Sequence, residues 1–163
     1  MSWTPNNSNV FIISNNFSEF GNTPFGNQYL GFSSPGAQDE QTIPGFVAGQ
    51  EYVLDLWISD IAGSSNPQLQ VLITGAATAT QTFNANQTSS LSFLEEQVPF
   101  TATIDGSITL DLIDAGSANV AVDNVSIAAV PEPSTVFAMP QPSARLRRSI
   151  SMASSRTPSF ERL

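Results

Sequence analysis

The side chains that could carry chemistry in this chain are almost all carboxylates. Cysteine, histidine and lysine are absent. Their absence removes disulfides, thiolate and histidine metal sites, Schiff-base chemistry and the serine–histidine–aspartate arrangement. The adjacent acids Asp39-Glu40 and Glu95-Glu96 would point to opposite faces of a strand, so neither pair is a ready acid–base dyad. We expect both pairs to be solvated loop charges, and we expect the chain not to be an enzyme.

A tryptophan and an aspartate in one segment form a candidate binding site. Alternation along Glu51 to Ser59 (EYVLDLWIS) turns Trp57 and Asp55 to the same side of a strand. An exposed aromatic ring beside a carboxylate can stack on a sugar ring and accept bonds from its hydroxyls. The alternative is that both faces of the strand are buried in the sandwich or in a dimer. The residues of the opposite, apolar face are Tyr52, Leu54, Leu56 and Ile58.

The charges are distributed unevenly. All five basic residues lie near the C-terminus: Arg145, Arg147, Arg148, Arg156 and Arg162. Thirteen acids and no cation precede Arg145. A body without cations cannot neutralise phosphates, so we do not expect the body to bind nucleic acid. No basic residue near Met1 marks a signal peptide, and the uncharged run from Ala62 to Leu94 is too polar for a membrane span. Either the chain is cytosolic or its export signal lies upstream.

Short segments of β-branched and aromatic residues, separated by turn residues, predict eight or nine strands. No stretch has a helical period longer than two turns. The spacing predicts an all-β antiparallel sandwich or jelly roll over residues 1–128. The candidate segments, of which 79–84 and 91–93 are the weaker ones, are 9–13, 28–32, 42–46, 51–59, 68–74, 79–84, 91–93, 98–104, 107–113 and 121–127. Pro99, near the start of its segment, suits an edge strand or the first position of a strand. The region 140–163 is rich in proline, serine and arginine and is predicted to be disordered.

The motif that follows the last predicted strand is Val130-Pro131-Glu132-Pro133. It resembles the sorting motif of PEP-CTERM proteins, and we assign residues 129–139 to it. The resemblance implies export to the cell surface and processing by an exosortase-type enzyme. The family places a membrane span after the motif. In this chain, Pro140 and Pro142 interrupt the segment where that span would begin. The tail is either native or the product of a frameshift or truncation.

The body resembles galactose-binding-like jelly rolls of carbohydrate-binding modules. Three segments carry the resemblance: Gly26 to Leu30, Gln41 to Leu54, and Val122 to Ile127. Such modules begin with a strand that this chain lacks, so its N-terminus is expected to be incomplete. The resemblance places a structural calcium ligand at Asp123, and hard oxygen ligands suit this ion. The alternative is a turn or strand-end aspartate that binds the backbone.

These observations lead to two hypotheses about function. The first is a non-catalytic, exported surface or extracellular-matrix protein that carries the sorting motif. The second is a carbohydrate-binding module that uses Trp57 and its neighbours against an extracellular polysaccharide. No cofactor is required by either, apart from the calcium suggested for Asp123.

Overall fold

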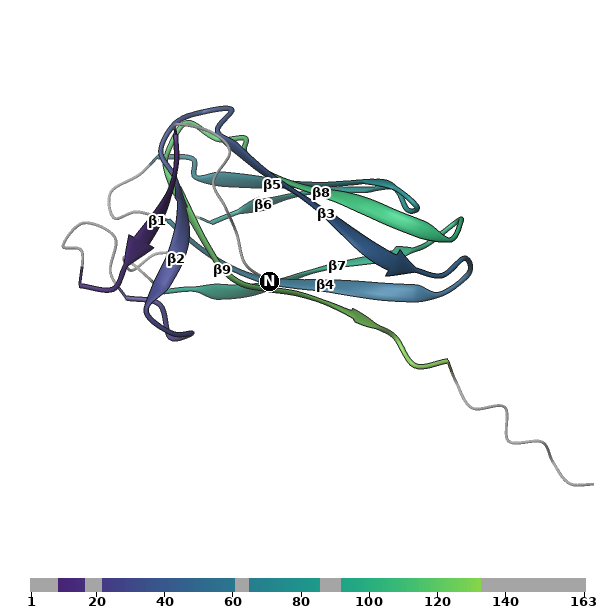
Figure 1. Ribbon diagram of the computed structural model, residues 1–163. Helices are drawn as coiled ribbons and strands as arrows, with labels where there is room; N and C mark the ends of the chain where they lie inside the picture. Colours follow the sequence, from purple (N-terminus) through teal and green to yellow (C-terminus); the bar gives the residue numbers. More distant parts are fainter. Residues whose placement is uncertain (1–8, 17–21, 61–64, 86–91, 133–163) are drawn as a thin grey trace, which may run out of the picture. The chain divides into compact units, whose positions relative to one another are not determined.

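The structure, a computed structural model, describes residues 9–16, 22–60, 65–85 and 92–132. These residues form nine strands and no helix, in two antiparallel sheets that face each other (Figure 1). The predicted all-β sandwich is therefore confirmed. The strands are β1 (Val10–Ser14), β2 (Gln28–Phe32), β3 (Gln38–Phe46), β4 (Glu51–Asp60), β5 (Gln68–Gly75), β6 (Ala79–Asn84), β7 (Leu94–Thr101), β8 (Gly106–Asp114) and β9 (Val120–Ala129).

We call the five-stranded sheet, in the order β1-β2-β9-β4-β7, sheet A. The four-stranded sheet, in the order β3-β8-β5-β6, is sheet B. The order places β9, the last strand, in the middle of sheet A between β2 and β4. It places β7 at an edge, as Pro99 predicts, because proline cannot donate to a second neighbour.

Alternating apolar residues build the core between the sheets. On β4, Leu54, Leu56 and Ile58 have 0% exposure, while Val53 and Asp55 face outward and are only partly buried. Strands β5 and β8 show the same period of two, which is the pattern of a strand that covers a core on one face. The largest fully buried side chains are Phe32, Leu54, Leu56, Ile58, Leu69, Ile73, Ile108, Leu110, Leu112, Val71, Val120 and Val122.

One glycine is required where β5 ends against β8. Gly75 has φ 95°, and a Cβ added there would lie 2.6 Å from the carbonyl oxygen of Ser107. That same oxygen accepts a hydrogen bond from the amide of Ala76 at 2.9 Å. A side chain at position 75 would therefore push apart two strands of sheet B where they are bonded.

Two acidic segments differ from the prediction. Strand β3 begins at Gln38 rather than Thr42, so Asp39 and Glu40 are strand residues, and Asp39 is fully buried. Strand β7 contains Glu95-Glu96 and ends at Thr101. Both acid pairs were expected in loops. Long antiparallel ladders with β8 and β4 extend these strands over residues whose own propensity for strands is low.

The segment predicted as a strand at 91–93 is not one. Ser92 and Phe93 precede β7 without joining a ladder, and Leu91 lies outside the described residues. The predicted strand at 98–104 is displaced, because β7 starts four residues earlier and the chain turns after Thr101.

Strand β9 is the last strand of the described body. The amide of Val130 donates to the carbonyl of Glu51 at 2.8 Å, which continues the pairing one residue beyond β9. The described residues, which end at Glu132, belong to one compact unit. The predicted disordered region and Pro133 lie outside the described residues. Within the described ranges, no helix has the length and apolar character needed to cross a membrane.

Candidate functional site

The outer face of sheet A carries two aromatic rings in contact. Trp57 projects outward from β4, and Phe25 comes from the segment that precedes β2. Their ring centroids are 4.6 Å apart, with the ring planes at 58°. Both side chains are partly buried, so part of each ring is open to solvent. We call this pair the Phe25–Trp57 platform.

A second, smaller hydrophobic cluster supports the platform. Its buried members are Ile13, Tyr29, Phe93 and Ala121, and Trp57 packs against them. The rings of Tyr29 and Phe93 meet edge to face, with centroids 5.5 Å apart. Gly31 leaves space for the cluster, because a Cβ there would clash with the Ile13 side chain. Trp57 therefore packs on this cluster and remains partly exposed, while the alternative of burial of both faces of β4 in a dimer stays open.

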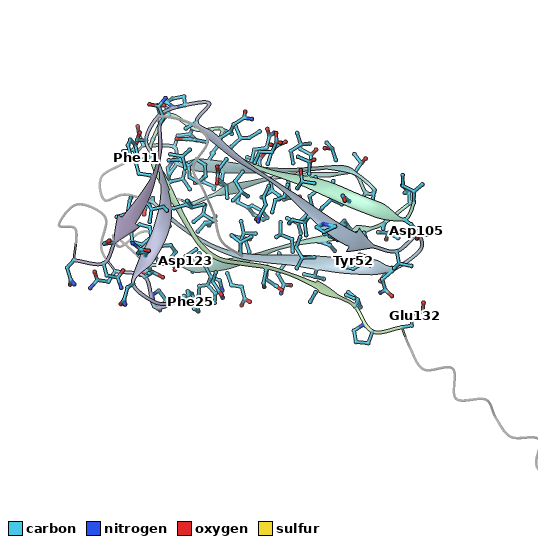
Figure 2. All side chains as sticks on the ribbon, in the orientation of Figure 1. Phe11, Phe25, Tyr52, Asp105, Asp123 and Glu132 are labelled. Carbon is cyan, nitrogen blue, oxygen red and sulfur yellow. The ribbon has the colours of Figure 1, made fainter. Side chains whose placement is uncertain are left out.

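Hydrogen bonds hold the segment that carries Phe25. The Oδ1 of Asn15 accepts from the amide of Thr23 at 2.9 Å, and its Nδ2 donates to the carbonyl of Gly26 at 2.9 Å. The Thr23 hydroxyl donates to Oδ2 of Asp123 on β9 and accepts from the amide of Phe25 at 3.0 Å. These bonds fix Phe25 from both sides and connect its loop to the centre of sheet A. Figure 2 shows Phe25 and Asp123 at the same end of the sandwich, away from Tyr52 and Asp105.

Asp123 lies opposite Trp57 in the pairing of β9 with β4, where the register shifts. Its neighbour Asn124 has φ 48°, and the amide of Asn124 donates to Oδ1 of Asp123 at 2.7 Å. Both carboxylate oxygens therefore bind the chain itself, which is the alternative role that the sequence left open. Among the described residues, no three acidic side chains lie close enough to hold a metal ion. The calcium role of Asp123 stays a prediction.

Polar side chains border the platform along β4 and β7. Asp55 accepts a hydrogen bond from Nε2 of Gln97 at 2.7 Å. Glu95 lies opposite Trp57 in the ladder and is exposed. The structure thus places Asp55 on the same face as Trp57, as predicted from alternation, and adds Phe25, Gln97 and Glu95. Phe25 was missed because Pro24 and Gly26 flank it, and no alternation of its own marks it.

The outer face of sheet B is different in character. Glu40 and Asp111 lie directly opposite each other on β3 and β8. Burial raises the pKa of Asp111 above its ordinary value, and the charge of Glu40 and a hydrogen bond with it raise this pKa further. Sequence reasoning missed the pair because its members are far apart along the chain. The other outward residues of sheet B include Gln38, Thr42, Gln70, Leu72, Thr74, Thr80, Thr82, Thr109 and Ile113.

The predicted sorting motif begins at the opposite end of the molecule from the platform. The carbonyl of Val130 accepts a hydrogen bond from Nε2 of Gln50 at 2.7 Å, so this residue is fastened to the turn before β4. Pro131 and Glu132 are exposed (Figure 2). Pro133 lies outside the described residues, and the sorting role of the motif stays a prediction.

No family model and no curated protein matches this sequence. Solved structures do match its fold. The CBM22-1 xylan-binding domain of Paenibacillus barcinonensis Xyn10C is 15% identical, covers 80% of this chain and 87% of its own, and has a TM-score of 0.54. TmCBM61, solved with β-1,4-galactotriose, is 11% identical over 79% and 88%, with a TM-score of 0.54.

A family 16 carbohydrate-binding module is 16% identical over 77% of this chain and 89% of its own, with a TM-score of 0.51. Identities this low show a common fold and do not carry residue roles. The fold of this chain is that of β-sandwich carbohydrate-binding modules.

Proposed function

We propose that this chain is a non-catalytic carbohydrate-binding module that recognises an extracellular polysaccharide through the Phe25–Trp57 platform. The observation that carries the proposal is the platform itself: two partly exposed aromatic rings on the outer face of a sheet, held by a hydrogen-bonded loop. The likeness to carbohydrate-binding modules supports the same class of function.

The chemistry of the platform suits a sugar. The C–H face of a pyranose is apolar and stacks on aromatic rings, while its hydroxyls need hydrogen-bond partners at the edge. Asp55 with Gln97, and Glu95, provide acceptors and a donor on the same face. An open site of this kind binds weakly, with a dissociation constant near millimolar, or about −4 kcal/mol.

The acids in the described body do not favour hydrolysis. Glycosidases hold two carboxyl groups about 5–10 Å apart so that the scissile bond and a water fit between them. Glu40 and Asp111 instead lie directly opposite each other on the neighbouring strands β3 and β8, and not on two sides of a cleft. The proposal is therefore recognition of the polysaccharide without cleavage.

Affinity electrophoresis through gels containing soluble polysaccharides tests the proposal. We expect the wild type to be retarded by at least one of them, and Phe25→Ala and Trp57→Ala to run unretarded. Trp57 also packs on the second cluster, so Phe25→Ala is the cleaner variant, and thermal melting checks that each variant is folded. Asp111→Asn, on the opposite outer face, is the matched control and should be retarded like the wild type.

Two results would contradict the proposal. Retardation by none of a broad panel would argue against polysaccharide binding altogether. Retardation that Asp111→Asn abolishes, and that Phe25→Ala leaves intact, would move the site to sheet B.

A second proposal concerns the route of the protein. We propose that it is exported and that Val130-Pro131-Glu132-Pro133 is an exosortase-type sorting motif. The observation in favour is position, because the motif starts one residue after β9 and its first three residues are at the end of the compact unit. Fractionation of source cells should find the protein at the surface or in the medium. A protein found in the cytosol alone would contradict export.

A further inference from the structure

Strand β1 is an edge of sheet A that carries none of the usual features against pairing with another chain. Its residues are Val10-Phe11-Ile12-Ile13-Ser14, with no charge, proline or glycine among them. It pairs along its whole length with β2 and with no other strand of the described residues (Figure 1). Proteins usually protect such edges with charges, prolines or bulges, because an edge strand presents unpaired N–H and C=O groups to other chains.

The other three edges of the sandwich are protected or polar. Strand β7 carries Glu95, Glu96 and Pro99. Strand β3 carries Asp39 and Glu40, and its pairing with β8 shifts register near its end. The exposed residues of β6 are threonine, glutamine and asparagine. Strand β1 is therefore the uncharged and apolar edge of the body.

Two apolar side chains of β1 are half exposed. Phe11 and Ile12 each have 48% exposure, although Val10 and Ile13 on either side of them are buried. Alternation puts Phe11 on the outer face of sheet A with Ile13, and Ile12 on the inner face with Val10. A further strand laid along β1 would cover both exposed side chains, because it would add a row of side chains on each face.

The hydrogen bonds at the two ends of the β1–β2 hairpin show which backbone groups of β1 face outward. The amide of Ser33 donates to the carbonyl of Asn9 at 2.9 Å, and the amide of Asn15 donates to the carbonyl of Asn27 at 2.9 Å. In an antiparallel pair, residues whose N–H and C=O groups face the partner alternate with residues whose groups face away. The odd-numbered residues from 9 to 15 therefore bond toward β2, and the groups of the even-numbered residues face the open edge.

These outward groups match those of a second β1. They belong to Val10, Ile12 and Ser14, which are spaced evenly about Ile12. If a second β1 runs antiparallel with Ile12 opposite its own copy, Val10 lies opposite Ser14, and all the outward groups find partners. In this register Phe11 lies beside Ile13 of the second copy on the outer face, and the two Ile12 side chains are neighbours on the inner face. Such a contact is two-fold and isologous, so it uses both edges and closes at a dimer.

The charge distribution favours the same edge for a second copy. The described residues include acids and no cation, so two copies repel each other over most of their surface. Every acid among the described residues lies at Asp39 or beyond, so the described ranges 9–16 and 22–38, which contain β1 and β2, are uncharged. Two copies that meet along β1 therefore bring the uncharged part of each body together.

From these observations we propose that β1 is a dimerisation strand, which pairs antiparallel with β1 of a second copy of this chain. The two five-stranded sheets then join edge to edge into one continuous sheet. An edge contact is at the small end of protein interfaces, so the dimer dissociates on dilution. Opposed side chains of paired strands point to the same face, so the Phe25–Trp57 platforms of both copies lie on one side of the joined sheet. The dimer itself does not depend on the proposed function.

Sedimentation velocity of the full chain at increasing concentration tests the proposal. We expect the wild type to change from monomer to dimer between about 10 μM and about 1 mM, without larger species. Ile12→Lys places two like charges opposite each other at the two-fold axis, and should raise the dissociation constant of the dimer at least about tenfold. Leu94→Lys is the matched control, because Leu94 is 45% exposed at the start of β7, the other edge of sheet A. This control should dimerise as the wild type does.

Single cysteines provide a second measurement that needs no charged variant. The chain has no cysteine of its own. Ile12→Cys should be joined into a covalent dimer by a short bifunctional maleimide, because the two side chains are neighbours at the axis. Leu94→Cys should remain monomeric under the same treatment. Thermal melting checks that every variant is folded, and cross-linking decides if Ile12→Lys does not fold.

Three results would overturn the proposal. A wild type that stays monomeric over the whole concentration range would show that β1 does not recruit a second copy. Growth beyond the dimer would show that the contact does not close on itself. Dimerisation that folded Ile12→Lys retains, or equal cross-linking of the two cysteine variants, would place the contact elsewhere on the body.

Discussion

The two outer faces of the sandwich share an architecture and differ in chemistry. Behind each face, alternating aliphatic residues fill the same core. In front, sheet A carries the Phe25–Trp57 platform on a second hydrophobic cluster, whereas sheet B carries hydroxyls, amides and the Glu40–Asp111 pair. The inward residues make the sandwich stable and say little about function. The outward residues distinguish the faces, so a ligand site must be sought among them.

Truncating the inward side chains to alanine gives the largest expected loss of stability. Leu54→Ala on sheet A and Leu110→Ala on sheet B each remove a side chain with 0% exposure. Each should lower the free energy of unfolding by about 2–5 kcal/mol through lost burial and a residual cavity. Val53→Ala, on the outer face beside Leu54, should cost clearly less. Chemical denaturation measures all three, and equal small losses would show that the two sides of β4 are not distinct.

A buried carboxyl group on the inner side of sheet B should make the stability of the protein depend on pH. Burial raises the pKa of Asp114, at the end of β8, from 3.8 to about 6, and a hydrogen bond from the Gly116 amide partly opposes this. The folded state thus holds the proton more tightly than the unfolded state. The ionised group destabilises the fold above pH 6, and this penalty disappears as the pH falls toward 4.

Asp114→Asn removes that penalty and can keep the bond to Gly116 through its own Oδ1. The variant should be more stable than the wild type at pH 8, by up to about 3 kcal/mol, and should lose the advantage at pH 4. Denaturation curves at the two pH values give the difference. An advantage of the same size at both would mean that ionisation of Asp114 is not its cause.

The loop that presents Phe25 should depend on Asp123. Asp123→Ala leaves the Thr23 hydroxyl and the Asn124 amide without their acceptor. The cost should be about 1–3 kcal/mol, and platform binding should weaken with it. Melting with calcium and with chelator tests the further prediction that Asp123 is a metal ligand. Calcium should then raise the melting temperature of the wild type and not that of the variant, whereas equal melting of the wild type in both would exclude that role.

The smallest expected change in stability comes from replacing one acid on each outer face. Glu40→Gln removes a like charge directly opposite Asp111, so it should stabilise the protein by about 0.2–1 kcal/mol at neutral pH. Asp55→Ala on sheet A should not stabilise, because Asp55 accepts a hydrogen bond from Gln97. Paired thermal melts measure both changes. The same sign for both variants would mean that the two acids have similar surroundings.

The sequence predicts those strands whose own residues alternate between apolar and polar. In Glu51–Asp60, apolar residues at every second position identify both the strand and its inward face. The segment Gln38 to Gln41 contains no apolar residue, and its strand exists because β8 pairs with it, so Asp39 was expected in a loop. Local pattern cannot reveal a partner some seventy positions away, and this same limit hides the Glu40–Asp111 pair.

The candidate site follows the same rule. Trp57 and Asp55 could be found because they share the alternation of β4. Phe25 could not, since its position over Trp57 depends on the bonds among Asn15, Thr23 and Asp123, which join three separate parts of the chain. For Asp123 the sequence left two roles open, a calcium ligand and an aspartate that binds the backbone. The structure shows the bond to the backbone amide of Asn124, and the calcium role stays a prediction.

The central position of β9 has a mechanical consequence. A pull on the chain beyond Glu132 reaches the body along β9, which is bonded to β2 on one side and β4 on the other. Such a load shears two ladders at once, so their hydrogen bonds resist together and do not open one by one as in a peeled edge strand. Asp123, which anchors the platform loop, belongs to the same strand. Traction between a bound polymer and an attachment at the C-terminus would therefore pass through a strand of sheet A that is bonded on both sides.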